Sequence, residues 1–345
     1  MFRSELCAAV VPQPAGRSPG EATAIPGASR IRAQLLAYYE VSTFEETGLV
    51  EGRAANVPEA ILQLREIFTS TLRFDVAKTL LNNYLTRWPQ ARALNIFLPV
   101  LAGVQGPADS FRDDRDRDLQ VVRSPGATTT FLVFCGIRHG FTVPLNVLHH
   151  CWLARYGVNV LYLRDFSHSL YLTGLKSVGD VEETCAALRD VLAGLETRKT
   201  VFIGNSGGVF GALYFADLMK ADLVLPFSGP SSLEIGLEET ERQAYPRLLQ
   251  LRNEGKIDWP DLRGLYAESN IPVRFYFGQR NRVDSAQAEN LSGLRCVKLC
   301  PVPTSSHFVL DFLAESGELD TVFRAAAQSK EETSWRSWFR PRSRR

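Results

Sequence analysis

The segment Thr200-Val-Phe-Ile-Gly204-Asn205-Ser206-Gly207-Gly208-Val-Phe-Gly211 decides how this chain is interpreted. A short apolar run with strand character leads into G-x-S-x-G, and an apolar run with helical character follows. A serine at such a turn takes strained backbone angles, and Gly204 and Gly208 let neighbouring backbone approach closely. The N-terminus of the next helix directs free N–H groups and a positive dipole toward the turn. The segment therefore predicts that Ser206 is a nucleophile.

A phosphate-binding loop is the competing interpretation, because glycine-rich turns between a strand and a helix also bind phosphates. A dinucleotide-binding loop requires G-x-G-x-x-G near the start of the fold and an acidic residue closing the next strand. Here several predicted strands precede the motif, and the next predicted strand, 223–227, ends without an acid. The nucleophile interpretation is therefore favoured.

A serine nucleophile of this type needs a histidine base later in the chain, just after a strand. His307 is the only histidine after Ser206. It follows the predicted strand 296–301 and lies in a short polar loop before the last predicted helix. We therefore predict that His307 is the base.

The acid is expected between the nucleophile and the base, after the predicted strand 273–277. The commonest position for this carboxylate would be 281, where the chain has asparagine. Asp284 is three residues further on, and an extended loop would bring it to the imidazole. The alternative role for Asp284 is the N-cap of the helix predicted at 285–291. Asp165, at the end of an earlier predicted strand, is the reserve candidate.

An oxyanion hole requires two backbone donors. The N–H of Gly207, directly after the nucleophile, is the first candidate. The second is expected in the loop after the predicted strand 129–135, where we assign the N–H of Ile137 and expect Gly136 to permit the turn. An ordinary glycine turn is the alternative for this loop.

Strands and helices alternate along the C-terminal two thirds of the chain. The predicted strands are 119–123, 129–135, 158–164, 200–204, 223–227, 273–277 and 296–301. The predicted helices are 144–156, 181–195, 207–220, 285–291 and 308–326. This alternation predicts an α/β fold with a mainly parallel sheet and helices on both of its faces.

The remaining chain divides by composition and periodicity. Apolar stripes at 61–72 and 76–88 predict helices, the second stopped by Pro89, and an apolar segment at 91–101 follows. The helix, Trp-Pro, helix order is similar to a tetratricopeptide hairpin, but only about one and a half units are present where stable arrays need about three. The expected organisation is a flexible leader at 1–30, a helical segment at 31–111, a solvated charged linker at 112–118, an α/β domain at 119–327 with an inserted cap at about 230–270, and a basic aromatic tail at 328–345.

Composition excludes several classes of protein. With 39 Lys and Arg against 38 Asp and Glu, the net charge of +1 argues against a nucleic-acid-binding protein. No apolar stretch approaches the roughly 20 residues of a membrane-spanning helix, and the first residues lack a signal-peptide pattern. The six cysteines form no C-x-x-C pair. We therefore expect a cytoplasmic protein with reduced thiols, no metal site and no organic cofactor.

Residues 119–327 resemble the α/β-hydrolase superfamily. Leu161-Tyr-Leu-Arg-Asp165, Tyr171-Leu-Thr-Gly174-Leu, Gly204-Asn-Ser-Gly-Gly208 and Asp284 followed by His307 are similar to a poorly characterised bacterial group, some of whose members carry tetratricopeptide-like helices. In that group the acid takes the later position, as Asp284 does here. The resemblance implies a Ser206, His307 and Asp284 triad and an acyl-enzyme intermediate, and it supplies no substrate.

Four arginines follow predicted strand ends: Arg138, Arg164, Arg280 and Arg282. Ligands of open α/β sheets bind at that edge, so these side chains are candidates for binding an anionic acyl substrate. Internal pairing, for instance with Asp165 or Asp284, is the equally weighted alternative.

The expected activity is hydrolysis of a small-molecule ester or thioester. Acyl transfer on the same fold is one alternative, and a non-catalytic protein that binds a partner through the helical segment is another. The C-terminal residues 335–345 carry aromatic residues and arginines, so contact with an anionic membrane surface is conceivable. A solvated tail is favoured over membrane contact.

Overall fold

A computed structural model describes residues 54–67, 74–95, 97–98, 111–235, 246–257 and 261–328. The predicted flexible leader at 1–30 and nearly all of the predicted tail at 328–345 lie outside these residues. Within the described residues, no helix is both long enough and apolar enough to cross a membrane.

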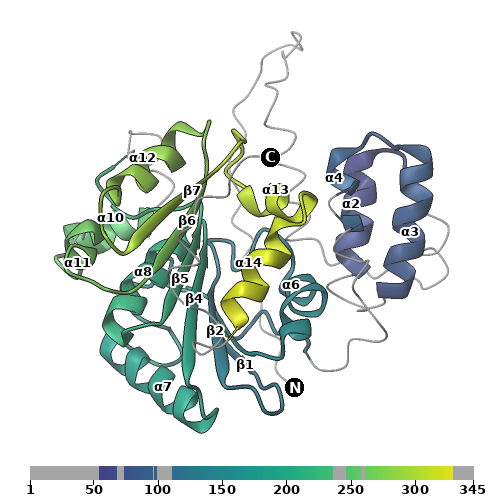
Figure 1. The fold of residues 1–345 in the computed structure, drawn as a ribbon. Helices are drawn as coiled ribbons and strands as arrows, with labels where there is room; N and C mark the ends of the chain where they lie inside the picture. The colour runs from purple at the N-terminus through teal and green to yellow at the C-terminus, as the bar shows by residue number, and fades with distance from the viewer. Residues whose placement is uncertain are drawn as a thin grey trace, which may run out of the picture. The chain divides into compact units, whose positions relative to one another are not determined.

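A single seven-stranded sheet forms the centre of the α/β region (Figure 1). Its strands are β1 (Leu119–Val122), β2 (Thr129–Phe134), β3 (Asn159–Leu163), β4 (Lys199–Asn205), β5 (Leu223–Phe227), β6 (Val273–Gly278) and β7 (Val297–Val302). Their order is β1-β3-β2-β4-β5-β6-β7, with β1 antiparallel to β3 and every other pair parallel. The predicted mainly parallel α/β fold is confirmed, and each strand lies within one residue of its predicted bounds.

Among the described residues, helices connect these strands and also follow the last of them. They are α6 (Leu145–Cys151) with the 3-10 helix η3 (Leu153–Tyr156), α7 (Val181–Gly194), α8 (Gly208–Met219), α10 (Pro246–Asn253), α11 (Leu262–Tyr266), α12 (Arg282–Asn290), α13 (Val309–Glu315) and α14 (Glu318–Ala327). The single helix predicted at 308–326 is wrong, because Gly317 takes a φ of 72° and separates α13 from α14. Such a left-handed residue ends a helix, and glycine adopts it without steric cost.

The two faces of the sheet carry separate apolar cores. Phe131 and Val133 of β2 pack in the core that includes α6, α13 and α14. Leu132 and Phe134 of the same strand pack in the core that includes α7, α8, α11 and α12. Figure 1 shows these two groups of helices on opposite sides of the strands. Side chains of a strand alternate between faces, so a strand buried on both sides has an uninterrupted apolar sequence.

Among the described residues, three helices precede the α/β region: α2 (Val57–Glu66), α3 (Phe74–Arg87) and α4 (Arg92–Asn95). Asn56 caps α2 by accepting a hydrogen bond from the N–H of Glu59, and α3 ends directly before Trp88-Pro89. In Figure 1, α2 and α3 lie side by side. The expected helices are therefore present in the described part of 31–111, while the tetratricopeptide likeness stays a prediction.

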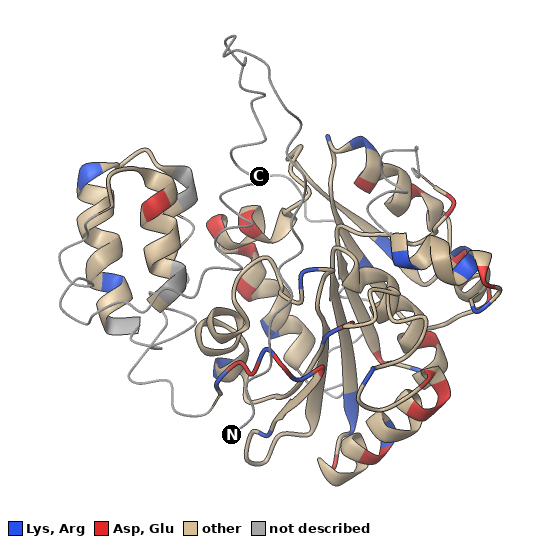
Figure 2. Cartoon of the chain, turned by 180° about the vertical axis from the view of Figure 1, so that it is seen from behind, with Lys and Arg blue, Asp and Glu red and all other residues tan. Residues whose placement is uncertain are grey.

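The charged segment 112–118 is solvated only in part, because Arg112, Arg115, Asp116 and Arg117 are exposed whereas Asp118 is buried. It is the stretch of coil in Figure 2 along which blue and red alternate. Asp118 is only 3% exposed, and its carboxylate accepts hydrogen bonds from both the N–H and the hydroxyl of Ser177. Asp113 forms an ion pair with the buried Arg164. The expectation was wrong in part because sequence alternation shows only that no apolar face exists, whereas Arg164 holds the Asp113 carboxylate and Ser177 holds the Asp118 carboxylate in the fold.

The long connection between β5 and β6 differs in part from the predicted cap at about 230–270. Residues 236–245 and 258–260 lie outside the described residues. The described α11 contacts α8, and the hydroxyl of Tyr266 donates a hydrogen bond to the carbonyl of Leu213 at 2.9 Å. The end of the connection is therefore a crossover helix within the layer that covers the sheet, not a cap.

Candidate active site

Ser206 lies at a sharp turn between β4 and α8. Its φ is 53°, in the left-handed region that is costly for a residue with a side chain. The turn is fixed on both sides, since the Ser206 N–H donates to the carbonyl of Phe227 at 3.1 Å and its carbonyl accepts from Val209 at 3.0 Å. A Cβ at Gly208 would lie 2.1 Å from the carbonyl oxygen of Phe134, so only glycine fits there. The G-x-S-x-G segment thus has the strained strand-to-helix geometry expected from the sequence.

His307 follows β7 and bridges two of the predicted site residues. Its Nε2 lies 2.9 Å from Oγ of Ser206, and its Nδ1 lies 2.9 Å from Oδ1 of Asp284. The loop that carries it is organised locally, because the hydroxyl of Ser306 accepts from the N–H of Phe308 at 3.0 Å. The imidazole is 36% exposed, whereas Asp284 is 3% exposed, so the site is open on the serine and histidine side.

Asp284 belongs to the first turn of α12, which begins three residues earlier than predicted. The N-cap is Asn281, whose side chain accepts from the N–H groups of Val283 and Asp284 at 3.1 Å each. The alternative role of Asp284 as the cap is therefore wrong. Asn281, at the commonest acid position, instead starts the helix that carries the carboxylate. The Asp284 side chain therefore lies where the N-terminal dipole of α12 attracts an acidic residue.

Asp165, the reserve acid, has no hydrogen bond to His307 in the described structure. Its carboxylate accepts from the N–H groups of Ser167 and Tyr171 at 3.1 Å each. Burial raises the pKa of Asp165, and these backbone hydrogen bonds oppose the rise. Asp165 thus organises the loop that follows β3.

The two predicted backbone donors come together beside Ser206. A Cβ at Gly136 would lie 3.3 Å from Cβ of Ser206, so this glycine permits the close approach of the loop. A Cβ at Gly207 would lie 3.4 Å from the backbone nitrogen of Ile137. Among the described residues, neither the Ile137 N–H nor the Gly207 N–H has a hydrogen-bond acceptor. Two free donors beside a serine hydroxyl are what an oxyanion requires.

The four arginines behave differently from one another. Arg164 is 1% exposed and donates to protein acceptors, so its predicted role in substrate binding is wrong. Arg280 is exposed and donates to the carbonyl of Pro303 at 3.2 Å. Arg138 and Arg282 are exposed at the same edge of the sheet. Burial of Arg164 follows from its place at the end of β3, where the chain before β1 covers it.

Sequence reasoning missed a pair of histidines next to the Ile137 loop. The rings of His139 and His168 lie 5.2 Å apart, and Phe166 packs on His139 at 4.8 Å. Burial lowers the pKa of His139, and the neighbouring His168 lowers it further. The signal was available, because these histidines follow two adjacent parallel strands, β2 and β3, whose carboxyl ends meet at one edge.

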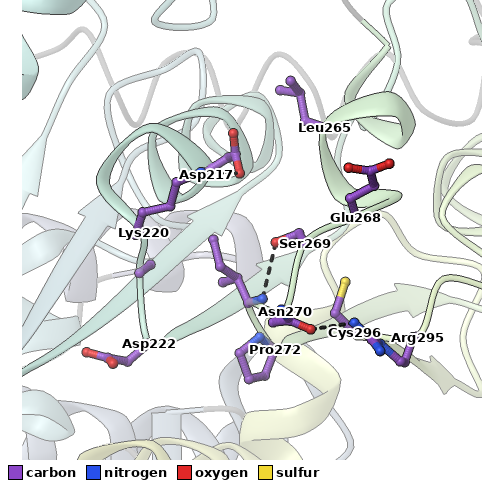
Figure 3. Close-up of a pocket in the computed structure, with 12 residues that line it drawn as sticks. Asp217, Lys220, Asp222, Leu265, Glu268, Ser269, Asn270, Pro272, Arg295 and Cys296 are labelled. Carbon is purple, nitrogen blue, oxygen red and sulfur yellow. Dashed lines mark hydrogen bonds and ion pairs between the residues drawn. The ribbon is translucent and has the colours of Figure 1, made fainter.

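A hollow of about 790 Å³ lies at the opposite edge of the sheet, where β5, β6 and β7 begin (Figure 3). Its charged side chains largely have protein partners. Lys220 pairs with Asp217 at 3.1 Å, and Arg295 donates to the side chain of Asn270 at 2.5 Å. The sequence reasoning did not identify this hollow, and none of the predicted site residues lines it.

The described residues contain no group of three or more His, Cys, Asp or Glu side chains that could hold a metal ion. The five cysteines among them are free thiols. Burial raises the pKa of Cys135 to about 12, which keeps this thiol protonated and unreactive.

Neither a scan against models of protein families nor a search of curated proteins found a match. Solved structures do match. MenH from S. aureus is 13% identical with a TM-score of 0.43, and the alignment covers 61% of this chain and 97% of MenH. A lipase-esterase related protein from Clostridium acetobutylicum is 14% identical with a TM-score of 0.44, covering 60% and 99%. MGS-MChE2, an alpha/beta hydrolase from a lagoon-sediment metagenome, is 15% identical with a TM-score of 0.43, covering 61% and 95%.

The order of the strands, the helices on both faces and the strand-serine-helix turn after β4 are all features of one fold. Ser206, Asp284 and His307 follow β4, β6 and β7, and their side chains meet at the carboxyl edge of the sheet. This chain has the α/β-hydrolase fold.

Proposed function

We propose that the protein is a serine hydrolase that cleaves an ester or thioester through an acyl-enzyme intermediate. The observation that carries the proposal is the unbroken line of hydrogen-bonding atoms from Ser206 Oγ to His307 to Asp284, with both distances at 2.9 Å. A nucleophile, a base within hydrogen-bonding reach and a third group that orients the base constitute the arrangement needed for acyl transfer.

In the first half of the reaction, Ser206 Oγ attacks the acyl carbon while its proton passes to Nε2 of His307. The negative charge that develops on the carbonyl oxygen is accepted by the N–H groups of Ile137 and Gly207. The tetrahedral intermediate then expels the alcohol or thiol, which takes the proton from His307. In the second half, His307 removes a proton from water, the resulting hydroxide attacks the acyl-enzyme, and Ser206 leaves with the proton.

Asp284 serves this cycle by holding one tautomer of His307. Its Oδ1 accepts from Nδ1–H, which leaves Nε2 free to accept the serine proton. Because Asp284 is buried and lies in the first turn of α12, its charge is directed at the imidazole and not screened by water. Its charge stabilises the imidazolium that forms in each half-reaction.

The proposed substrate is a small acyl compound that carries a negative charge away from the reacting carbonyl. Arg138 directly follows the proposed oxyanion donor Ile137, and Arg280 and Arg282 follow β6. All three are exposed, and Arg138 has no ion-pair partner among the described residues. Exposed arginines at the carboxyl edge favour binding of carboxylate or phosphate groups.

Labelling with a fluorophosphonate probe tests the proposal. We expect covalent labelling of the wild type, none of Ser206→Ala, and full labelling of the matched variant Ser228→Ala, which removes a buried serine at the end of the neighbouring strand. A folded wild type that labels no more than Ser206→Ala would refute the proposal and favour a non-catalytic role. If labelling occurs, the partition of the acyl-enzyme between water and added alcohols or amines separates a hydrolase from an acyltransferase.

A further inference from the structure

Arg164 lies at the end of β3 and is buried by the segment that precedes β1. Its guanidinium points donors in three directions. Nε donates to the carbonyl of His139 at 3.1 Å, and Nη1 donates to the carbonyl of Arg117 at 2.9 Å. Nη2 donates to the carboxylate of Asp113 in an ion pair. One side chain therefore joins the loop after β2 to the charged segment 112–118.

The loop that contains His139 is the turn that presents the Ile137 N–H. The N–H of His139 donates to the carbonyl of Gly136 at 2.8 Å, and the N–H of Gly136 donates to the carbonyl of Gly140 at 2.9 Å. Ile137 is thus a central residue of a closed turn, with His139 at its far end. His139 has a φ of 59°, so the turn includes a strained residue that needs support from its surroundings.

The charged segment is itself anchored, so it provides a fixed counterpart for Arg164. The N–H of Asp113 donates to the side chain of Asn146 at 2.8 Å, and the N–H of Asp114 donates to the side chain of Gln120 at 3.0 Å. The backbone of the segment also pairs with Arg164, whose N–H donates to the carbonyl of Asp118 at 2.8 Å. These contacts hold Asp113 in place on the buried side of the segment.

We infer that Arg164 is a positioning residue for the oxyanion hole and that Asp113 holds it in place. A planar guanidinium has donors in a fixed fork, so its ion pair with Asp113 sets where Nε meets the His139 carbonyl. A buried guanidinium must also keep its acceptors, because an unpaired buried donor is costly. Arg164 therefore resists displacement of the turn, and the Ile137 N–H keeps its place beside Gly207.

The inference rests on the proposed hydrolase function. It gives the charged segment a part in positioning the oxyanion hole for that reaction. Without the Arg164 fork, the Ile137 N–H would occupy a wider range of positions. Its hydrogen bond to the oxyanion of the transition state would weaken more than its contact with the carbonyl oxygen of the bound substrate. The predicted signature is a lower kcat with little change in KM.

Three variants test it. Asp113→Asn removes the ion pair, and Arg164→Lys keeps the charge but loses the fork. Asp118→Asn is the matched control, because it alters another buried carboxylate of the same segment whose partner is Ser177. We expect kcat to fall by about 10- to 100-fold in the first two variants and by less than about twofold in the control. Kinetics are measured below the unfolding temperature of the least stable variant.

Hydrogen exchange supplies a readout that needs no activity. The amides of Gly136 and His139 should exchange faster in Asp113→Asn and Arg164→Lys but not in Asp118→Asn, which should instead affect the amide of Ser177. Unchanged exchange at Gly136 and His139, or an equal loss of kcat in Asp118→Asn, would overturn the inference. An inactive wild type in which the exchange pattern holds would refute the proposed hydrolase function and leave the structural coupling standing.

Discussion

The two edges of the sheet differ in how the backbone is bent. At the carboxyl edge, the non-glycine residues with positive φ are His139, Thr142, His168, Leu170, Tyr171, Ser206 and Ser228. At the amino edge, the described non-glycine residues with positive φ are Glu196, two residues after the end of α7, and Lys220, directly after the end of α8. Left-handed residues at helix ends are ordinary, whereas helix termination explains none of those around Ser206.

The edges also differ in how their charges are arranged. The hollow at the amino edge has carboxylates with nearby cations, such as the pair of Asp217 and Lys220. At the carboxyl edge, Asp284 is buried against one imidazole, and the N–H groups of Ile137 and Gly207 have no acceptor in the part of the chain that the structure describes. Strain and unused donors gathered at one edge support placing the proposed chemistry there, although a hollow of about 790 Å³ lies at the amino edge.

The largest expected effect is on kcat, and it should distinguish Asp284 from Asp165, the two carboxylates near the carboxyl edge. Asp284→Asn should lower kcat by about 10⁴-fold, because an amide holds the wrong imidazole tautomer. Asp165→Asn should lower stability through the loop at 167–171 and leave kcat within about tenfold. Steady-state kinetics and thermal unfolding of both variants check this. A greater loss of kcat in Asp165→Asn than in Asp284→Asn would show that Asp165, and not Asp284, is the acid.

A smaller effect is expected on the free energy of unfolding when Gly208 and Gly194 are each replaced by alanine. Gly208→Ala should destabilise the fold by at least about 3 kcal/mol, because the new methyl group would lie 2.1 Å from the carbonyl oxygen of Phe134. Gly194→Ala, at the end of α7 with nothing within 4 Å, should gain up to about 1 kcal/mol. Urea unfolding measures both. Similar stabilities for the two variants would contradict the claim that the turn after β4 has no room for a side chain.

The buried His149 of α6 should make the stability of the fold depend on pH. Burial lowers the pKa of His149 to about 3, with His150 contributing a second, smaller decrease. Below pH 6.5 the unfolded chain binds a proton that folded His149 does not, so stability falls as pH falls, by up to about 1.4 kcal/mol per unit. Urea midpoints between pH 7 and 5 should show this slope, and His149→Gln should reduce it. An unchanged slope in the variant would assign the effect to other groups.

The smallest effect concerns the exposed arginines of the two edges. Arg138→Ala should reduce the preference for anionic over neutral esters by about two- to fivefold at low salt, since an exposed charge contributes at most about 1 kcal/mol. Arg295→Ala, at the amino edge, should leave that preference unchanged. Competition assays with matched ester pairs at two ionic strengths check this. Equal effects of the two variants would mean that net charge, not position, sets the preference.

Sequence patterns were sufficient for the sheet and for the serine turn. Apolar runs separated by helical periodicity placed all seven strands, and burial of the central strands on both faces leaves few alternatives for them. Gly204, Ser206 and Gly208 marked the turn, since its steric demands restrict which residues fit. The order of Ser206, Asp284 and His307 along the chain could also be seen in the sequence. Because the base must follow the serine in that order, the earlier histidines were excluded as candidates.

Contacts between distant segments were less accessible. The charged segment 112–118 had no sequence signal for burial, because its partner Arg164 lies about fifty residues later. Because its partner Asp113 is far away in the sequence, Arg164 could not be distinguished from the exposed arginines that also follow predicted strands. The helix pair at the C-terminus was misread because Gly317 lay within an otherwise continuous helical pattern.

The sequence by itself determined the mainly parallel sheet and the serine turn, and it singled out Ser206 and His307 as the proposed nucleophile and base, because local sterics and burial act on neighbouring residues. Only the tertiary structure decided that Asp284 and not Asp165 faces His307, that Arg164 is buried with its Nε donating to the His139 carbonyl, and that Asp118 of the charged segment is buried. These outcomes depend on which strand ends lie side by side and on which buried charges find partners there. Strand order and charge pairing are properties of the folded chain.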